Sequence, residues 1–354
     1  MDQLDFNSHD FQNKKKRKWG RFFLLAGFLA VSYIIFNTAL FNKEFEIKNE
    51  FAEEDKFEAA WLKKFAGLLF FNQNHAEEID KNYIMPEKEP NRLDILILGI
   101  RGEGDENAEE GGALLTDTMM VFSHDQLTKK SSLVSIPRDF YVKIGSNKNK
   151  INSAYEYGLL RKEGADYAKK LVSQITGVYI DNAVVVDFSS FEKLIDQLRG
   201  IDITLTKSFR EEGQWGYAFE LPAGENHLNG QNALYYVRSR YSSNDFDRAF
   251  RQQQVLFAIK NKVTTLHLIS DPIKILSVIN TLSQNIKTDI NIWDVKEIID
   301  LAKEVDTSPA MFKKEVLSTE NLLYQSTGPQ GAYILLPQGD SFDQIKQLFQ
   351  EIIK

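Results

Sequence analysis

The sequence predicts an α/β or α+β domain, in which a central mixed sheet is flanked by helices, preceded by one N-terminal transmembrane helix. Three observations lead to this fold class. A run of 20 residues at 22–41 carries no charge. From residue 93 onward, short apolar runs alternate with segments of helical periodicity. The chain has 354 residues, of which 43% are apolar, and this is enough to build a sizeable core.

The uncharged run at 22–41 is long enough to cross a membrane. At ~1.5 Å per residue it spans ~30 Å, the thickness of one hydrocarbon core. The basic block KKKRK precedes it, which predicts a cytoplasmic N-terminus. We therefore expect a cytoplasmic basic tail at 1–18, a transmembrane helix at 19–41, and an extracytoplasmic main domain on the cell membrane. A cleaved signal peptide is the alternative, but no small-residue cleavage site follows the run cleanly.

Residues 42–91 form a predicted extracytoplasmic connector. Its apolar residues recur at spacings of three or four positions, which indicates an amphipathic helix. They are Phe57, Trp61, Phe65 and Leu68. A helix that spaces the domain from the membrane is the preferred interpretation, and a helix lying on the membrane surface is the alternative. The two prolines of MPEKEPN then predict a linker.

The main domain is predicted to begin with the strand LDILILGI at 93–100. Apart from Asp94 this run is apolar, as expected for a central strand that is covered on both faces. Later runs have strand character as well, and helical patterns lie between some of them. The further predicted strands are 117–123, 131–136, 182–188, 201–205 and 332–337, and the predicted helices are 164–177 and 189–200. The helix at 189–200 has a capping-box pattern at Ser189 and Glu192 and a stop at Gly200.

Composition narrows the classes of function. The formal net charge of −7 disfavours nucleic acid as a partner, because nucleic-acid-binding domains carry a basic face. Cysteine is absent, so disulfides, thiolate catalysis and cysteine-ligated zinc are excluded. Neither G-x-S-x-G nor H-E-x-x-H occurs, so the usual signatures of serine hydrolases and zinc proteases are missing.

Against this acidic background, the segment YYVRSRYSSNDFDRAFRQQQ at 235–254 gathers four arginines. Its polar stretch SSND predicts the N-cap of a helix that runs from Phe246. Arg248, Arg251 and Gln252 then share one face of the first turns. Backbone N–H groups at a helix N-terminus also favour anions. This face is therefore a candidate phosphate-binding surface.

Arg238 and Arg240 precede that helix, in a stretch that we interpret as extended. Alternate side chains of an extended stretch point to the same side, so the two arginines would face one ligand. Guanidinium groups donate paired hydrogen bonds that match phosphate. The alternative is an arginine–carboxylate network on a solvated face, and for the cluster taken alone it is the better interpretation.

Two more motifs lie where predicted strands end. SIPRDF places Arg138 and Asp139 after a strand, at the edge where open α/β sheets bind ligands. A glycine-rich acidic loop follows the strand at 93–100 and leads to Asp117. Its carboxylates can bind a hard cation such as Mg²⁺. A solvated acidic loop is the alternative for every acid except Asp117, which lies at the entrance of the next strand.

Taken in order, these motifs resemble the LytR–CpsA–Psr (LCP) family of envelope phosphotransferases. The resemblance covers about residues 93–264 and includes TDTMM, SIPRDF, LNGQNALYYVRSR and DFDRAFRQQQVL. It implies an LCP-type catalytic domain at 92–265 with an apolar lipid-binding pocket, and a C-terminal extension at 266–354 packed on it. It implies transfer of a phospho-glycan from a polyprenyl-pyrophosphate carrier to peptidoglycan or another envelope glycan acceptor. Mg²⁺ or Mn²⁺ would be the cofactor.

The resemblance also implies roles for individual residues. The pyrophosphate-binding positions match Arg138, Arg238, Arg240, Arg248, Arg251 and Gln252. Asp117 matches a metal-associated aspartate. Asp245 falls on an acidic position of the motif before R-x-x-R-Q. Asp139 and Asp245 are the candidates for deprotonating the acceptor hydroxyl, and they complete the predicted catalytic set with Arg138.

The chain departs from the family pattern just after the first strand. An aspartate often follows the strand's glycine, whereas this chain has Arg101. Glu103 or Asp105 is expected to replace that carboxylate as a metal ligand. Two other functions stay open: a pyrophosphatase that uses water as the acceptor, and a non-catalytic regulator or scaffold that binds lipid-linked glycan. The missing aspartate is the best argument for the regulator.

Overall fold

The computed structural model describes the main domain. The residues described are 85–102, 112–266, 286–290, 300–301 and 303–354. The chain divides into two compact units, 1–75 and 76–354, and every described residue belongs to the second. The predicted tail, transmembrane helix and nearly all of the connector lie outside the described residues. Across the described ranges, no helix combines the length and the apolar character needed to span a bilayer.

A mixed sheet of six strands forms the centre of the described part of the chain, in the order β11–β6–β1–β2–β3–β12. β1 runs parallel to β6 and antiparallel to β2, and β3 runs parallel to β12. The strands are β1 (Arg92–Ile100), β2 (Thr116–Asp125), β3 (Ser131–Ser135), β6 (Asn182–Asp187), β11 (Ile286–Thr288) and β12 (Phe312–Val316). The predicted central mixed sheet is confirmed.

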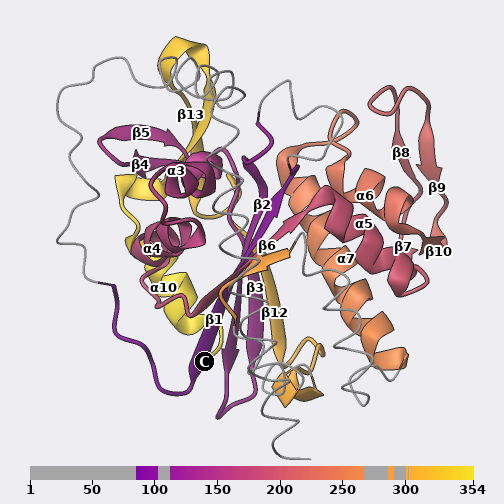
Figure 1. Ribbon diagram of the computed structural model, residues 1–354, viewed down its shortest axis with the longest axis horizontal. Helices are drawn as coiled ribbons and strands as arrows, with labels where there is room; N and C mark the ends of the chain where they lie inside the picture. Colours follow the sequence, from indigo (N-terminus) through magenta and orange to yellow (C-terminus); the bar gives the residue numbers. More distant parts are fainter. Residues whose placement is uncertain (1–84, 103–111, 267–285, 291–299, 302) are drawn as a thin grey trace, which may run out of the picture. The chain divides into compact units, whose positions relative to one another are not determined.

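Helices cover both faces of this sheet (Figure 1). On one face lie α3 (Ala154–Leu160), α4 (Ala165–Thr176) and α10 (Asp343–Glu351). On the other face lie α5 (Phe188–Gln197), α6 (Gly230–Arg238) and α7 (Asp245–Thr265). The flanking helices predicted from the sequence are therefore present, and they form one layer on each side of the sheet.

β1 shows how the two faces of the sheet differ. Leu96 and Leu98 are fully buried in the core that the sheet shares with α4 and α10. Ile97 and Gly99 point to the opposite face, because successive side chains of a strand alternate. They are only partly buried, and Ile97 packs on a smaller cluster that includes residues of α7. The face toward α3, α4 and α10 is thus a closed core, while the face toward α5, α6 and α7 borders a cavity.

Short antiparallel pairs surround these layers. They are β4 (Tyr141–Ile144) with β5 (Asn147–Lys150), β7 (Ile201–Leu205) with β10 (Gly224–Leu228), β8 (Phe209–Glu211) with β9 (Phe219–Leu221), and β13 (Leu323–Thr327) with β14 (Tyr333–Pro337). Three 3₁₀ helices complete the described elements: η2 (Ile151–Ser153), η5 (Pro329–Gly331) and η6 (Gln338–Asp340). The predicted strand at 201–205 exists, but it pairs with β10 and not within the central sheet.

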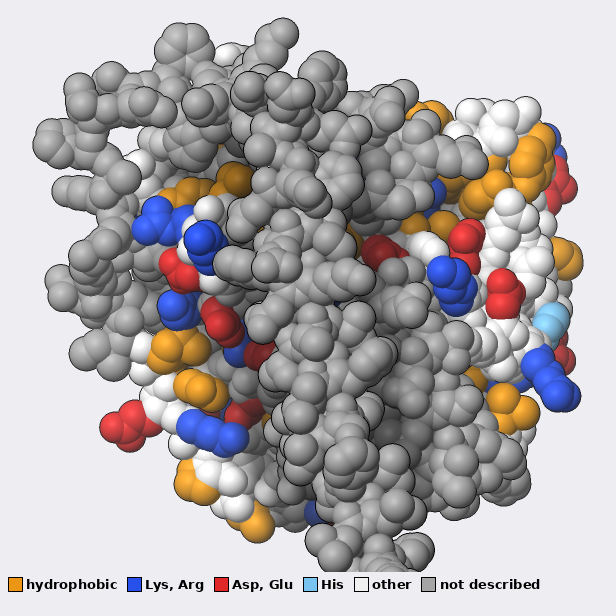
Figure 2. All heavy atoms as spheres, in the orientation of Figure 1, with side chains coloured by type: hydrophobic (Ala, Val, Ile, Leu, Met, Phe, Trp, Pro, Cys, Tyr) orange, Lys and Arg blue, Asp and Glu red, His pale blue; other side chains and the backbone are white. Residues whose placement is uncertain are grey.

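The C-terminal part of the chain belongs to these same layers. β12 adds an edge strand beside β3, and β11 pairs with β6 at the other edge. Ile345 and Phe349 of α10 are fully buried in the main core. Figure 2 shows the surface of one side, where acidic and basic side chains are interspersed over the described residues.

One helix start differs from the prediction. α5 begins at Phe188, and its N-cap is Asp187, whose carboxylate accepts the N–H of Ser190 at 2.7 Å. The expected capping box at Ser189 was therefore wrong, because the preceding aspartate already satisfies the free N–H groups of the first turn. Gly200 does follow the end of the helix, with φ at +81°.

Candidate active site

A cavity of about 340 Å³ lies between the central sheet and the layer of α5, α6 and α7. This volume falls within the range of about 300–1,000 Å³ that is usual for small-molecule pockets. Much of its wall is apolar and comes from β1, β2, β6 and the three helices. These residues are Ile97, Met120, Val186, Phe191, Leu194, Leu234, Val237, Leu256 and Ile259.

The same cavity has a strongly basic lining. Its charged and amide residues in the described ranges include Arg101, Asp117, Arg138, Asp187, Gln214, Arg238, Arg240, Arg248 and Gln252. They come from the ends of β1, β2, β3 and β6, from the β8–β9 loop, from the end of α6 and the chain that follows it, and from the first turns of α7. The sequence order gives no hint of this convergence, because residues more than 130 positions apart meet at one wall. A cavity with apolar walls and basic groups fits an amphipathic anion.

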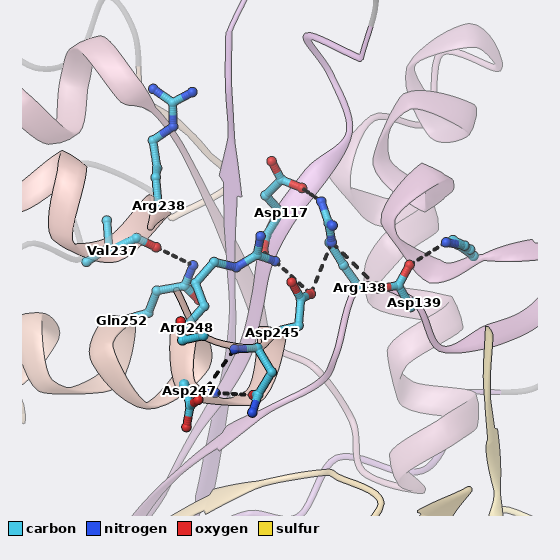
Figure 3. Close-up of polar contacts among 12 residues, drawn as sticks. Asp117, Arg138, Asp139, Val237, Arg238, Asp245, Asp247, Arg248 and Gln252 are labelled. Carbon is cyan, nitrogen blue, oxygen red and sulfur yellow. Dashed lines mark hydrogen bonds and ion pairs between the residues drawn. The ribbon is translucent and has the colours of Figure 1, made fainter. Parts of the chain in front are cut away.

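Arg138 and Arg248 alternate with two aspartates in a hydrogen-bonded ring (Figure 3). Arg138 Nη1 donates to Asp117 Oδ1 at 2.7 Å, and Arg138 Nε donates to Asp245 Oδ2 at 3.1 Å. Arg248 Nη2 donates to the same Asp245 oxygen at 3.0 Å and to the backbone oxygen of Asp117 at 3.1 Å. The two aspartates thus orient both arginines before any ligand arrives.

Burial acts on both arginines of the ring. It tends to lower the pKa of Arg138, but Asp245 and Asp117 outweigh it, so that pKa lies above its usual value. Burial lowers the pKa of Arg248, which is 5% exposed, and Asp245 offsets only part of the effect. Arginine nonetheless keeps its proton in proteins, so both groups are cations. The buried Nε of Arg248 has no hydrogen-bond partner among the described residues, which leaves it as a donor for a ligand.

Asp117 is held ionised by the same contacts. Burial tends to raise its pKa, but the charges of Arg138 and Arg248 and the hydrogen bond from Arg138 hold that pKa below its usual value. The carboxylate therefore stabilises the fold fully above the unfolded-state pKa of about 3.9. This contribution is lost as the pH falls through the lower, folded-state pKa.

We expect Asp117→Asn to be less stable than wild type at pH 7, because it loses the ionic contacts with Arg138 and Arg248. The difference in free energy of unfolding should be smaller at pH 3, because this pH lies below the unfolded-state pKa of about 3.9 and protonation of the unfolded carboxyl then favours unfolding of the wild type. Urea unfolding midpoints of both proteins at the two pH values measure it. If the difference in free energy of unfolding between the two proteins is the same at pH 7 and at pH 3, the charge of Asp117 does not stabilise the ring.

Arg251 and Gln252 flank Arg248 on α7 but have different surroundings. At about 100° per residue, Arg251 is displaced about 60° around the helix from Arg248 in one direction and Gln252 about 40° in the other. Gln252 lines the cavity and donates to the backbone oxygen of Val237 at 3.4 Å.

Arg251 is 8% exposed and is not among the cavity-lining residues. It donates to the backbone oxygens of Tyr236 and Ser239 and to Ser243 Oγ. Its guanidinium therefore ties α7 to the end of α6 and to the chain between them.

Arg238 and Arg240 both line the cavity, but not from an extended stretch. Asn229 caps α6 by accepting the N–H of Asn232 at 2.9 Å, and the helix continues to Arg238 as its last residue. Arg240 follows in the connection to α7 and is exposed. The extended conformation was wrong because the capped helix runs further than the alternation of arginines suggested.

The start of α7 places Asp245 at the ring. Asn244 is the N-cap, and its side chain accepts the N–H of Asp247 at 2.8 Å, while Asp247 accepts the N–H of Asn244 at 3.4 Å. This reciprocal pair is a capping box, which stabilises the first turn. The predicted N-cap in SSND is thus present, and the helix starts one residue before Phe246.

Asp139 lies beside the ring and not in the cavity lining. It is 8% exposed and accepts a hydrogen bond from Lys150 Nζ at 2.5 Å. Arg138 Nε is 3.7 Å from its carboxylate. Asp139 therefore forms an ion pair with Arg138 from outside the ring, while the carboxylate of Asp139 is also paired with Lys150.

The predicted metal ligands Glu103 and Asp105 lie outside the described residues. Gly102 N–H donates to Ala113 O at 2.9 Å, which closes the base of their loop next to the cavity-lining Arg101 and Gly112. In the described ranges, no three possible metal ligands come together. Of the predicted metal ligands, Asp117 is the one within the described ranges. A single carboxylate provides too few oxygen ligands for a Mg²⁺ site.

Sequence reasoning missed three residues that surround Arg238. The guanidinium carbon of Arg238 lies 4.2 Å from the ring centroid of Phe188 and 5.1 Å from that of Trp215. Gln214 binds the backbone on both sides of Ser239. The available signal was the stretch GQWGYAF, in which three aromatic residues recur at every second position close to two glycines.

Three comparisons with known proteins bear on this site. The sequence model of the LytR_cpsA_psr family matches residues 34–351. "Regulatory protein MsrR" of Staphylococcus aureus (strain COL) is 31% identical over 225 residues, which are 62% of this chain and 63% of MsrR. "Polyisoprenyl-teichoic acid--peptidoglycan teichoic acid transferase TagV" of Bacillus subtilis (strain 168) is 29% identical over 266 residues, 73% of this chain and 63% of TagV. The match thus spans less than two thirds of the length of either relative.

The fold has a solved counterpart. The crystal structure of B. subtilis TagV superposes with a TM-score of 0.59 at 27% sequence identity, and the match covers 75% of this chain and 98% of that chain. The mixed sheet with its two helical layers is therefore shared with a protein whose name describes a transferase.

Proposed function

Because the chain belongs to the LytR–CpsA–Psr family, we propose that it transfers a phospho-glycan from a polyprenyl-pyrophosphate carrier to peptidoglycan or another envelope glycan. The observation that carries this proposal is the composition of one cavity, in which apolar walls and several arginines occur together. A polyprenyl pyrophosphate has the same two parts, a hydrocarbon tail and a doubly charged headgroup. The relative TagV is named a polyisoprenyl-teichoic acid--peptidoglycan teichoic acid transferase, and this name describes a reaction of the same class.

The arginines supply most of the proposed catalysis. The acceptor hydroxyl oxygen attacks the glycan-proximal phosphorus in line, and the bond from that phosphorus to the bridging oxygen breaks. Polyprenyl phosphate leaves with the electron pair. Arg138 and Arg248 donate hydrogen bonds to the phosphate oxygens, where negative charge develops, and being preoriented they need little reorganisation.

The proton of the attacking hydroxyl needs an acceptor. We propose Asp245 first, since it belongs to the ring, and Asp139 second, since its carboxylate is already paired with Lys150 Nζ at 2.5 Å. Phosphoryl transfer proceeds through a loose transition state in most analyses, which makes a strong base less important than charge stabilisation. A divalent cation such as Mg²⁺ or Mn²⁺, held by Asp117 with Glu103 or Asp105, would add further neutralisation of the headgroup.

The N-terminal sequence supports a proposal for the location of the protein. We propose that residues 19–41 anchor it in the cell membrane, with the cavity on the extracytoplasmic side. The tail of the donor can then pass from the bilayer into the apolar part of the cavity. This arrangement gives the connector at 42–91 the role of setting the height of the cavity above the membrane.

A direct assay tests the proposal. Full-chain protein in detergent is mixed with a polyprenyl-pyrophosphate-linked glycan and a peptidoglycan acceptor, with and without Mg²⁺. We expect release of polyprenyl phosphate that requires the acceptor, and a covalent glycan–acceptor product. Release that proceeds equally well without acceptor would identify a pyrophosphatase instead.

Two observations favour a second candidate function. MsrR is named a regulatory protein, and Arg101 stands where the family resemblance implies an aspartate. A non-catalytic receptor for lipid-linked glycan would bind the donor tightly through the same cavity. Donor binding without any turnover, over a range of Mg²⁺ and Mn²⁺ concentrations, would favour this function over the transferase.

A further inference from the structure

The loop of the β8–β9 hairpin contacts residues 238–242, which comprise the end of α6 and the chain that follows it. We call these residues the arginine segment. Gln214 Nε2 donates to the backbone oxygen of Arg238 at 3.1 Å, and Gln214 Oε1 accepts the N–H of Arg240 at 2.8 Å. Trp215 Nε1 donates to Ser239 Oγ at 3.1 Å. Two consecutive side chains of the hairpin thus bind three consecutive residues, of which Arg238 and Arg240 line the cavity.

Glu211 extends this contact along the segment. It is fully buried, and its Oε2 accepts from Tyr241 N at 3.1 Å, from Ser242 N at 3.3 Å and from Ser242 Oγ at 3.1 Å. The other oxygen, Oε1, is buried without a hydrogen-bond partner among the described residues, so loss of the Oε2 contacts would leave the whole buried carboxylate unsatisfied. Each residue from Arg238 to Ser242 therefore has at least one hydrogen bond with a side chain of the hairpin.

Trp215 also acts on the side chain of Arg238. The guanidinium lies against Phe188 and Trp215, at 4.2 and 5.1 Å from the two ring centroids. Trp215 is itself stacked on Tyr235, with centroids 4.4 Å apart and planes 10° apart. Aromatic rings occupy the faces of a guanidinium, while its N–H donors lie in its plane. The stack therefore sets the plane in which Arg238 presents its donors.

The loop has a conformation suited to this contact. Gly213 and Gly216, which bracket Gln214 and Trp215, have φ at +80° and +76°. A side chain at either position would be strained there, although it would meet no atom within 4 Å. The glycines are thus required by the backbone turn and not by crowding, and the turn directs Gln214 and Trp215 toward the arginine segment.

We propose that Trp215, assisted by Gln214, is a positioning residue that holds Arg238 and Arg240 in the orientation in which they bind a pyrophosphate headgroup. The inference rests on the proposed function, since it concerns the same anionic ligand. Trp215 acts through the arginines and does not touch the ligand. The β8–β9 hairpin is accordingly part of the headgroup site, although it lies outside the sheet and the helical layers.

The test uses farnesyl pyrophosphate and farnesol as probes, which share one tail and differ in the headgroup. Affinities are measured by calorimetry with the full chain in detergent. We expect Trp215→Leu to weaken farnesyl pyrophosphate about tenfold, by loss of the stack and of the oriented donors, and to leave farnesol unchanged. Trp215→Phe keeps a ring beside Arg238 and should stay within about threefold of wild type.

Two controls separate positioning from general destabilisation. Phe250→Leu removes an aromatic ring that is 56% exposed and is not among the cavity-lining residues, and it should leave both affinities unchanged. In an Arg238→Ala background, Trp215→Leu should have little further effect, because the two residues act as one unit.

Three results would overturn the inference: unchanged farnesyl pyrophosphate binding in Trp215→Leu, equal weakening of both probes, or an undiminished effect of Trp215→Leu without Arg238. The wild-type protein tests the proposed function separately. If it binds farnesyl pyrophosphate no better than farnesol, the cavity has no headgroup site, and the proposed function fails before the variants are compared.

Discussion

Arg138→Ala should reduce release of polyprenyl phosphate by about 10³-fold or more, the scale on which catalytic arginines act in phosphoryl transfer. Arg138 is bonded to both aspartates of the ring, at 2.7 Å to Asp117 and 3.1 Å to Asp245. Its removal takes away a donor to the phosphate and leaves the cavity-lining carboxylate of Asp117 without its hydrogen-bonded cation, while Asp245 keeps Arg248 at 3.0 Å. A pyrophosphate would then meet negative charge where the wild type offers a guanidinium.

Arg138→Lys separates the two effects. Lysine keeps the charge but lacks the rigid fork that reaches both aspartates, so we expect only partial recovery of activity. Arg161→Ala is the matched control, because Arg161 is 30% exposed, compared with 21% for Arg138, and also pairs with a carboxylate, Glu163 at 3.6 Å. Lipid phosphate release is measured by chromatography and folding by thermal unfolding. Activity of a folded Arg138→Ala within tenfold of wild type would contradict the proposed mechanism.

The sequence predicts the central strands because their burial leaves a strong pattern. β1 is apolar over nearly its whole length and lies between β6 and β2 in the sheet. The segment IDITL of β7 alternates instead, and its burial alternates in the same way. Alternation is typical of an antiparallel pair that is covered on one face. The alternating pattern of β7 thus distinguishes a strand of a peripheral pair from the nearly continuous apolar run of the central strand β1.

The site is predicted less completely, for geometric reasons. Arg248 and Arg251 share one broad helix face by spacing, yet only Arg248 lines the cavity, since about 60° of rotation decides which neighbour each meets. That choice depends on how α7 packs on α6, which periodicity does not encode. Trp215 was missed for a related reason. Its contacts to Ser239 and Arg238 join a loop to a helix end, and no spacing rule connects such residues.

Filling the apolar part of the cavity should greatly weaken the binding of the lipid-linked donor without unfolding the protein. Leu256 of α7 lines this part of the wall, and a tryptophan there would occupy space that we assign to the lipid tail. Displacing about four methylene groups from apolar contact costs ~3 kcal/mol, or roughly 100-fold in affinity. We therefore expect Leu256→Trp to weaken a long polyprenyl-pyrophosphate donor by about that factor.

The same variant should bind inorganic pyrophosphate as the wild type does, because the arginine ring is untouched. Leu160→Trp makes the same substitution at a residue that is 52% exposed, and it should change neither affinity. Arg138→Ala should weaken both ligands, so the two site variants together assign the tail and the headgroup to different parts of one cavity. If Leu256→Trp stays folded and binds the long donor as tightly as wild type, the tail lies elsewhere. The arginines would then serve a soluble pyrophosphate or a donor bound at the surface.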